Sequence, residues 1–272
     1  MSKIILSSDQ NIDYLFYVPL TSFVCQQFGF EPLIFLLGSS KYSNLIEEYS
    51  KRYSKCIIIN IDGISPYRDS TVVQMSRLYA ACFEKDDNEY LMTGDIDMLL
   101  LNNYLYRDFD KMNLYGYDLT NFQQYPICYI GMQSKKWKEL LNIQEGNFIE
   151  NIIRDLEEEK KLATSSNFND YWFTDQRFIT RKIKQFGENN FQIINRGVVN
   201  GCATKRIDRS HPITWNISEG DDHIDCHLLK EGYLIENFTK IKKIIQMKVK
   251  HSEWIDEYFN EFNKIRCEKY DR

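Results

Sequence analysis

The residues of this sequence best suited to chemistry are two aspartates, Asp95 and Asp97, which interrupt an apolar stretch. Apolar residues flank them at 90–92 and 98–101, so burying them without a partner would cost considerable free energy. If the stretch is one continuous strand, side chains two residues apart point the same way and can reach one cation. The pattern therefore predicts a metal or phosphate site rather than a surface turn.

The spacing alone is not specific, because the chain contains a second Asp-x-Asp at Asp108 and Asp110. The apolar neighbours are what distinguish the first pair.

The elements that must position the aspartates are alternating strands and helices. Residues 3–6, 32–37 and 56–61 are continuous apolar runs, typical of strands covered on both faces of a parallel sheet, and helical segments separate them. Ligands collect outside the carboxyl ends of such strands, where polar residues follow each run. We therefore expect one cleft to contain Ser7, Ser8, Asp9, Asp62, Asp95 and Asp97.

Further helices are predicted at 70–84 and, with Thr174 as N-cap, from 174 to about 185. An aromatic stripe of Trp254, Tyr258 and Phe262 on a C-terminal helix predicts packing against the domain. We expect an α/β domain with a mostly parallel central sheet over residues 1–235, and a helical extension packed on it over 236–272.

Composition excludes several classes of protein. A net charge of −5 argues against a general nucleic-acid binder, so an anionic substrate would need local cations. The seven cysteines form no C-x-x-C pair and favour a reduced, cytoplasmic chain. The sequence contains no run of about 18 apolar residues, so it predicts no integral membrane segment. Phosphate-binding glycine motifs and the hydrolase elbow G-x-S-x-G do not occur. His223 and His227 have the spacing of the zinc motif H-E-x-x-H, but Ile224 replaces its glutamate.

Six short motifs occur in an order that resembles the GT-A fold glycosyltransferases, in particular the small Asp-x-Asp enzymes of bacteria and of large DNA viruses such as the chlorella viruses. The similarity covers about residues 3–235. The motifs are Gln74-x-Ser76-Arg77-Leu78-Tyr79, Thr93-Gly94-Asp95-Ile96-Asp97, Tyr129-x-Gly131-Met132, Phe173-Thr174-Asp175-Gln176, Lys205-Arg206-Ile207-Asp208-Arg209 and Asp225-Cys226-His227-Leu228-Leu229.

The resemblance implies a Rossmann-like GT-A domain that moves a sugar from a nucleotide-diphosphate sugar to a glycan or other hydroxyl acceptor. It implies Mn²⁺ or Mg²⁺ held by Asp95, Asp97 and His227, the last favoured over His223 although the glycogenin-like H-x-x-G-x-x-K-P-W ending is absent. A viral source would place the enzyme in the host cytoplasm. Nucleotide-sugar contacts are expected from Ser7, Ser8, Asp9, Asp62, Arg77 and Asp95, and catalytic roles from Asp175 and Gln176.

Alternative interpretations stay open for single residues. Arg77 could be a helix-surface arginine paired to Asp69 or Asp95, and Asp175 a helix N-terminal charge. Residues 7–9 could be a strand-end turn, and His227 a structural histidine. If Asp175 is not catalytic, Asp208 and Asp225 are the next candidates.

Two other functions also remain open. One is a noncatalytic sugar-nucleotide or carbohydrate-binding protein. The other is a nucleotidyltransferase, which needs a Gly-Ser about ten residues before its Asp-x-Asp, whereas the Gly-Ser here is at Gly38-Ser39.

Overall fold

A computed structural model describes residues 2–64, 66–102, 111–116, 124–144, 146–162, 173–195, 198–199, 202–203, 205–218, 221 and 223–268. The second Asp-x-Asp, at Asp108 and Asp110, lies outside these residues.

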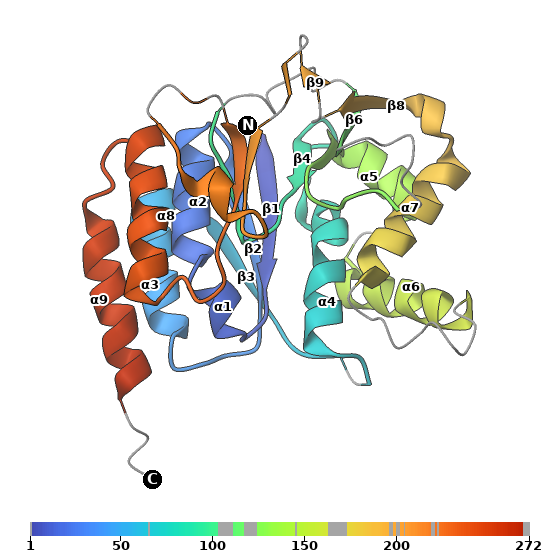
Figure 1. Cartoon of the computed structure of the whole chain (residues 1–272). Helices are drawn as coiled ribbons and strands as arrows, with labels where there is room; N and C mark the ends of the chain where they lie inside the picture. The colour runs from blue at the N-terminus through green and yellow to red at the C-terminus, as the bar shows by residue number, and fades with distance from the viewer. Residues whose placement is uncertain are drawn as a thin grey trace.

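The central feature is a seven-stranded sheet with the order β3-β2-β1-β4-β7-β6-β8 (Figure 1). Strands β1 to β4 run parallel, β7 is antiparallel to β4 and β6, and β6 is parallel to β8. The mostly parallel sheet is therefore as predicted. The strands are β1 (Lys3–Ser8), β2 (Glu31–Leu37), β3 (Ile57–Ile61), β4 (Tyr90–Thr93), β6 (Met112–Gly116), β7 (Ile130–Gln133) and β8 (Phe191–Asn195).

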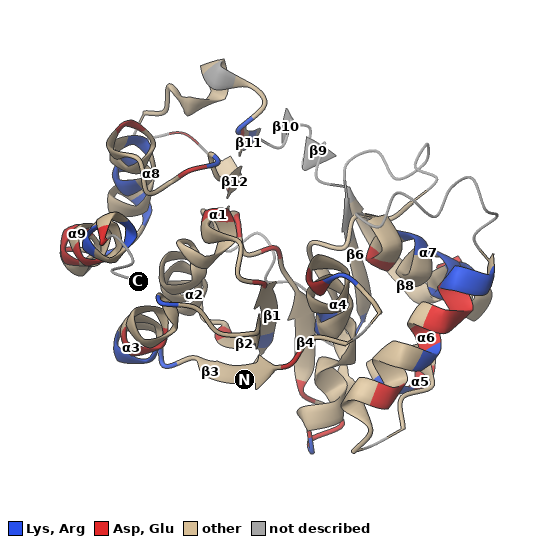
Figure 2. Ribbon diagram, turned by 90° about the horizontal axis from the view of Figure 1, so that it is seen from below, with Lys and Arg blue, Asp and Glu red and all other residues tan. Residues whose placement is uncertain are grey.

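Two helical layers cover this sheet, as Figures 1 and 2 show. Successive residues of β1 point to opposite layers: Ile4 and Leu6 belong to one hydrophobic cluster and Ile5 to the other. The first layer contains α2 (Val18–Gln27), α3 (Ser43–Ser54), α8 (Ile235–Lys248) and α9 (Trp254–Cys267). The second contains α4 (Asp69–Ser76), the 3-10 helix η1 (Arg77–Phe83), α5 (Ser134–Leu141), α6 (Phe148–Leu162) and α7 (Thr174–Phe186).

Two details differ from the sequence prediction. β3 is an edge strand that is only partly buried, with Ile57 42% exposed, because an apolar run does not reveal whether a strand has one neighbour or two. The single helix expected at 70–84 is split, because α4 ends at Ser76 and Tyr79 leaves helical geometry (φ −106°, ψ 15°) within η1.

A second sheet joins distant parts of the chain, in the order β11 (Lys205–Asp208), β12 (His223–His227), β5 (Met98–Leu100). β12 is antiparallel to β5, with His227 opposite Met98, and the Leu228 amide donates to the Asp97 carbonyl at 2.9 Å. This pairing brings the end of β12 beside the aspartate motif. The remaining short elements are α1 (Ile12–Leu15), β9 (Val198–Val199), β10 (Cys202–Ala203), η4 (Glu188–Asn190) and η5 (Pro212–Trp215).

The aromatic stripe on α9 packs against the domain, as predicted. Trp254, Tyr258 and Phe262 are buried, and the Tyr258 hydroxyl donates to the Phe16 carbonyl at 3.0 Å. The C-terminal helices share one hydrophobic cluster with β1 and β2. In the described part of the chain, no helix has both the length and the apolar character that crossing a membrane requires.

Candidate active site

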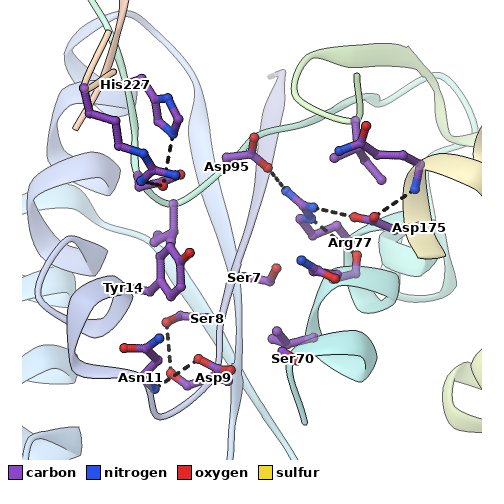
Figure 3. Close-up of a pocket in the computed structure, with 17 residues that line it drawn as sticks. Ser7, Ser8, Asp9, Asn11, Tyr14, Ser70, Arg77, Asp95, Asp175 and His227 are labelled. Atoms are coloured by element: carbon purple, nitrogen blue, oxygen red, sulfur yellow. Dashed lines mark hydrogen bonds and ion pairs between the residues drawn. The ribbon is translucent and has the colours of Figure 1, made fainter. Parts of the chain in front are cut away.

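A cavity of about 470 Å³ lies at the carboxyl ends of β1 and β4. In Figure 3, Tyr14, Ser8 and His227 lie on one side of it, Arg77 and Asp175 on the other, and Ser7 between them. The cavity is lined by Ser7, Ser8, Asp9, Asn11, Tyr14, Ser70, Val73, Gln74, Arg77, Asp95, Ile96, Asp97, Ile127, Asp175, Gln176, Arg209 and His227.

The two aspartates of the motif lie in a turn between two strands, so the prediction that one continuous strand carries them is wrong, although both line the cavity. β4 ends at Thr93, and the chain then turns before β5 begins at Met98 in the other sheet. The Met98 amide donates to the Asp95 carbonyl at 3.1 Å within this turn. Two-residue periodicity fails because the chain changes sheets between these strands. Asp95 consequently faces Arg77, whereas Asp97 faces Arg209 and His227.

Arg77 connects this turn to the start of α7. Its side chain is only 5% exposed, and its Nη1 donates to the Gly94 carbonyl at 2.9 Å and to Asp95. Its Nη2 donates to Asp175 Oδ2 at 2.8 Å. Pairing with Asp95 therefore occurs as anticipated, but the arginine is buried rather than on a helix surface.

Asp175 is buried at the beginning of α7 with both carboxylate oxygens bonded. Its Oδ2 accepts a hydrogen bond from Arg77, and its Oδ1 accepts one from the backbone amide of Gln176 at 2.8 Å. Burial raises its pKa above the ordinary value, and Arg77 opposes that shift. Thr174 is the first residue of α7 rather than its N-cap: the cap position is Phe173, and the Thr174 hydroxyl accepts a bond from Arg177 at 3.3 Å.

A second charged cluster surrounds Asp97, whose side chain is 10% exposed. Arg209 Nη1 donates to Asp97 Oδ2 at 2.7 Å, and His227 Nε2 lies 3.4 Å from the same oxygen. Burial acts to raise the Asp97 pKa, but His227 and Arg209 outweigh it and hold the pKa below its ordinary value. Behind the imidazole, Asp208 Oδ2 lies 3.8 Å from His227 Nδ1. Asp97 is thus an ionised carboxylate between two nitrogen groups.

The other predicted residues divide between the cavity and its surroundings. Ser7, Ser8 and Asp9 line the cavity at the end of β1, and burial raises the Asp9 pKa. Asp62 is exposed and is not among the lining residues. His227 lines the cavity and His223 does not.

Asp208 and Asp225, the alternative candidates for the catalytic carboxylate, also lie outside the cavity lining. Asp208 lies behind His227. Asp225 is buried and accepts two hydrogen bonds from Arg206, from Nε at 2.7 Å and from Nη2 at 2.8 Å.

Eight lining residues were given no role from the sequence: Asn11, Tyr14, Ser70, Val73, Gln74, Ile96, Ile127 and Arg209. Burial and, to a smaller extent, the negative charge of Asp97 raise the pKa of Tyr14 to about 12. Two signals were available. Asn11 and Tyr14 closely follow the polar end of β1, and Arg209 ends one of the six motifs.

The charge of the cavity lining is negative. Four carboxylates, Asp9, Asp95, Asp97 and Asp175, face two guanidinium groups, Arg77 and Arg209. Each of these arginines is already bonded to at least one of the carboxylates. A diphosphate entering this cavity would therefore need an additional cation.

The residues present fit a divalent cation in chemistry, although the predicted three-ligand set is not assembled. Among the residues that the structure describes, no three His, Cys, Asp or Glu side chains are gathered to hold an ion. Carboxylate oxygen and imidazole nitrogen do suit Mg²⁺ and Mn²⁺. The 3.4 Å between Asp97 Oδ2 and His227 Nε2 is near the roughly 3 Å that separates neighbouring ligand atoms around an octahedral ion.

No protein-family model and no curated protein matches this chain. Solved structures do: the glycosyltransferase GlyE of Streptococcus pneumoniae TIGR4 superposes with a TM-score of 0.50 at 10% identity, covering 99% of this chain and 66% of its own. The apo form of GlyE superposes with a TM-score of 0.50 at 9% identity, covering 97% of this chain and 64% of its own. The chain has the GT-A fold. It spans slightly less than two thirds of the length of these two structures.

The galactosyltransferase LgtC, in complex with donor and acceptor sugar analogs, superposes with a TM-score of 0.49 at 12% identity, covering 94% of this chain and 99% of its own.

Proposed function

We propose that this protein is a divalent-metal-dependent glycosyltransferase, which moves a sugar from a nucleotide-diphosphate sugar to a hydroxyl acceptor. The observation that carries the proposal is the cavity's charge: four carboxylates outnumber two guanidinium groups that are both bonded to them. Such a cavity repels a bare diphosphate but accepts one together with a cation. The GT-A fold supports the same conclusion.

Asp97 and His227 are the proposed metal ligands, with Asp95 the third candidate across the turn. Bound Mn²⁺ or Mg²⁺ would supply positive charge to the diphosphate leaving group. Asp208, 3.8 Å from the far nitrogen of His227, favours the ring orientation in which Nε2 faces Asp97.

The nucleotide and sugar positions follow from the two sides of the cavity. Ser7, Ser8 and Asp9 at the end of β1 are proposed to contact the nucleotide, while exposed Asp62 is left out of the proposal. Asp175 and Gln176 are proposed to face the sugar and acceptor. Arg77, bonded to Asp95 and Asp175, would keep both carboxylates in place rather than bind phosphate itself.

The test is a panel of nucleotide-diphosphate sugars, with and without Mn²⁺. We expect one donor to raise the melting temperature only when Mn²⁺ is present, because a ligand that binds the folded state alone stabilises it. The same donor should release nucleoside diphosphate. Asp97→Asn should abolish both responses while the protein stays folded.

The matched control is Asp87→Asn, which removes a carboxylate that is 60% exposed and paired with Lys138 at 2.9 Å. It should leave both responses unchanged. Full turnover in excess EDTA would contradict metal dependence. Metal-dependent donor binding without hydrolysis or transfer to any acceptor would instead identify a noncatalytic sugar-nucleotide-binding protein.

A further inference from the structure

Arg209 differs from the other cavity arginine in how firmly it is held. Arg77 is 5% exposed and donates to two carbonyls, of Gln74 and Gly94, and to the two carboxylates of Asp95 and Asp175. Arg209 is 23% exposed, and in the described part of the chain its carboxylate partner is Asp97, reached through a single nitrogen. Separating the Arg209 guanidinium from Asp97 therefore costs less free energy than separating Arg77 from its partners.

The Arg209 backbone, in contrast, is fixed by its neighbours. It follows β11 in a turn where the Ser210 amide donates to Asp208 Oδ1 at 2.8 Å. The Asp208 amide in turn donates to the Thr214 hydroxyl at 2.9 Å. A movement of Arg209 is thus confined to its flexible side chain.

We propose that Arg209 is an exchangeable counterion: it holds Asp97 Oδ2 in the absence of metal, and it moves to the diphosphate when metal binds there. The inference rests on the proposed function. It starts from the observation that Asp97 Oδ2 already carries a cation at 2.7 Å, on the oxygen nearest to His227 Nε2.

Charge makes the exchange necessary. A divalent ion and a guanidinium on one carboxylate oxygen repel each other, and arginine does not relieve this by losing its proton. Arg209 lines the same cavity that receives the diphosphate, and a guanidinium forms strong bonds with phosphate oxygens. The displaced side chain therefore has a partner within its own cavity.

The proposal predicts effects of opposite sign in one variant. Arg209→Gln should bind Mn²⁺ alone about tenfold more tightly than the wild type, because the competing cation is gone. The same variant, saturated with Mn²⁺, should bind its nucleoside diphosphate about tenfold more weakly, because a phosphate contact is lost. Titration calorimetry with MnCl₂, then with uridine, guanosine and adenosine diphosphates, measures both constants.

Two further variants make the result specific. Arg209→Lys keeps the charge but not the planar fork, so it should retain the competition with Mn²⁺ and lose part of the diphosphate affinity. Arg52→Gln removes an exposed cation from α3, outside the cavity lining, and should change neither constant.

Unchanged or weaker Mn²⁺ binding in Arg209→Gln would overturn the exchange, as would unchanged diphosphate binding. If the wild type binds Mn²⁺ in an Asp97-dependent manner and Arg209→Gln does not differ from it, only this inference fails. If the wild type binds no Mn²⁺ with or without a diphosphate, the proposed function fails as well. Circular dichroism of each variant confirms that it is folded.

Discussion

At the scale of single residues, the cavity contains two buried aspartates in different electrostatic environments. Burial acts to raise the pKa of both, but in Asp97 the nitrogen groups of His227 and Arg209 outweigh it. In Asp175 burial prevails over Arg77, and the charge of Asp95 adds to it. Asp97 is therefore suited to hold a cation, and Asp175 to exchange a proton.

We predict that Asp175→Asn lowers kcat at least hundredfold, because an amide cannot accept the proton of an attacking hydroxyl. Asparagine keeps the shape of the side chain, and Arg77 keeps its bonds to Asp95 and the Gly94 carbonyl. Nucleoside diphosphate binding should change by less than about threefold, so the loss should be in kcat. Steady-state kinetics and calorimetry on the same preparation measure the two quantities.

The melting temperature of Asp175→Asn serves as the control for folding, because removing one partner of a buried ion pair is destabilising. A folded variant whose kcat remains within threefold of the wild type would contradict a catalytic role. The carboxylate would then serve only to anchor Arg77.

At the scale of elements, β1 carries the polar end of the cavity, and an ion pair holds its beginning. Lys3 donates to Glu84, which follows η1, and their side chains are 15% and 13% exposed. Burial acts to raise the Glu84 pKa, but Lys3 and the Asp86 amide outweigh it and keep the pKa below its ordinary value of 4.5. The pair therefore ties β1 to the end of η1.

This pair predicts a pH-dependent contribution to stability. A carboxyl group whose pKa is lowered by folding stabilises the fold above its ordinary pKa of 4.5, and the contribution disappears as the pH falls through the lowered value. Urea unfolding of wild type and Lys3→Met should thus differ most above pH 5 and converge in stronger acid. Lys138→Met, whose partner Asp87 is 60% exposed, is the control and should show little difference at any pH. A constant gap between Lys3→Met and the wild type would contradict the prediction.

The strands and helices around the cavity could be predicted from the sequence because each has a simple pattern. Apolar runs gave β1, β2 and β3, and polar residues at the ends of β1 and β4 marked the side of the sheet where the cavity lies. Local patterns do not indicate where a chain leaves one sheet for another. For this reason the placement of Asp95 and Asp97 on one strand was wrong and the contact of Arg209 with Asp97 was missed, because both depend on β5 pairing with β12.

At the scale of the whole molecule, the C-terminal helices belong to the same core as the sheet. Phe262 is fully buried and its ring centroid lies 5.0 Å from that of Phe16 and 4.5 Å from that of Tyr42. We predict that Phe262→Ala lowers the free energy of unfolding by about 3 to 5 kcal/mol, the usual cost of emptying a phenylalanine site. Denaturant unfolding should show one transition.

The control is Ile213→Ala, at a side chain that is 80% exposed, with an expected change of at most about 0.5 kcal/mol. Two separate transitions in the wild type or in Phe262→Ala would contradict a shared core. Residues 236–272 would then be an independently folding extension, and the division at residue 235 would mark a true domain boundary.

The pairing of β5 with β12 also sets the order in which a newly synthesised chain can mature. His227 leaves the ribosome 130 residues after Asp97, roughly 7 to 26 s later at ordinary translation rates. Until Arg209 emerges, 112 residues after Asp97, the Asp97 carboxylate has neither Arg209 nor His227 beside it, although β1 to β4 can already pair. A nascent chain arrested before residue 205 is therefore expected to have part of the main sheet but not the charged cluster of Asp97, Arg209 and His227.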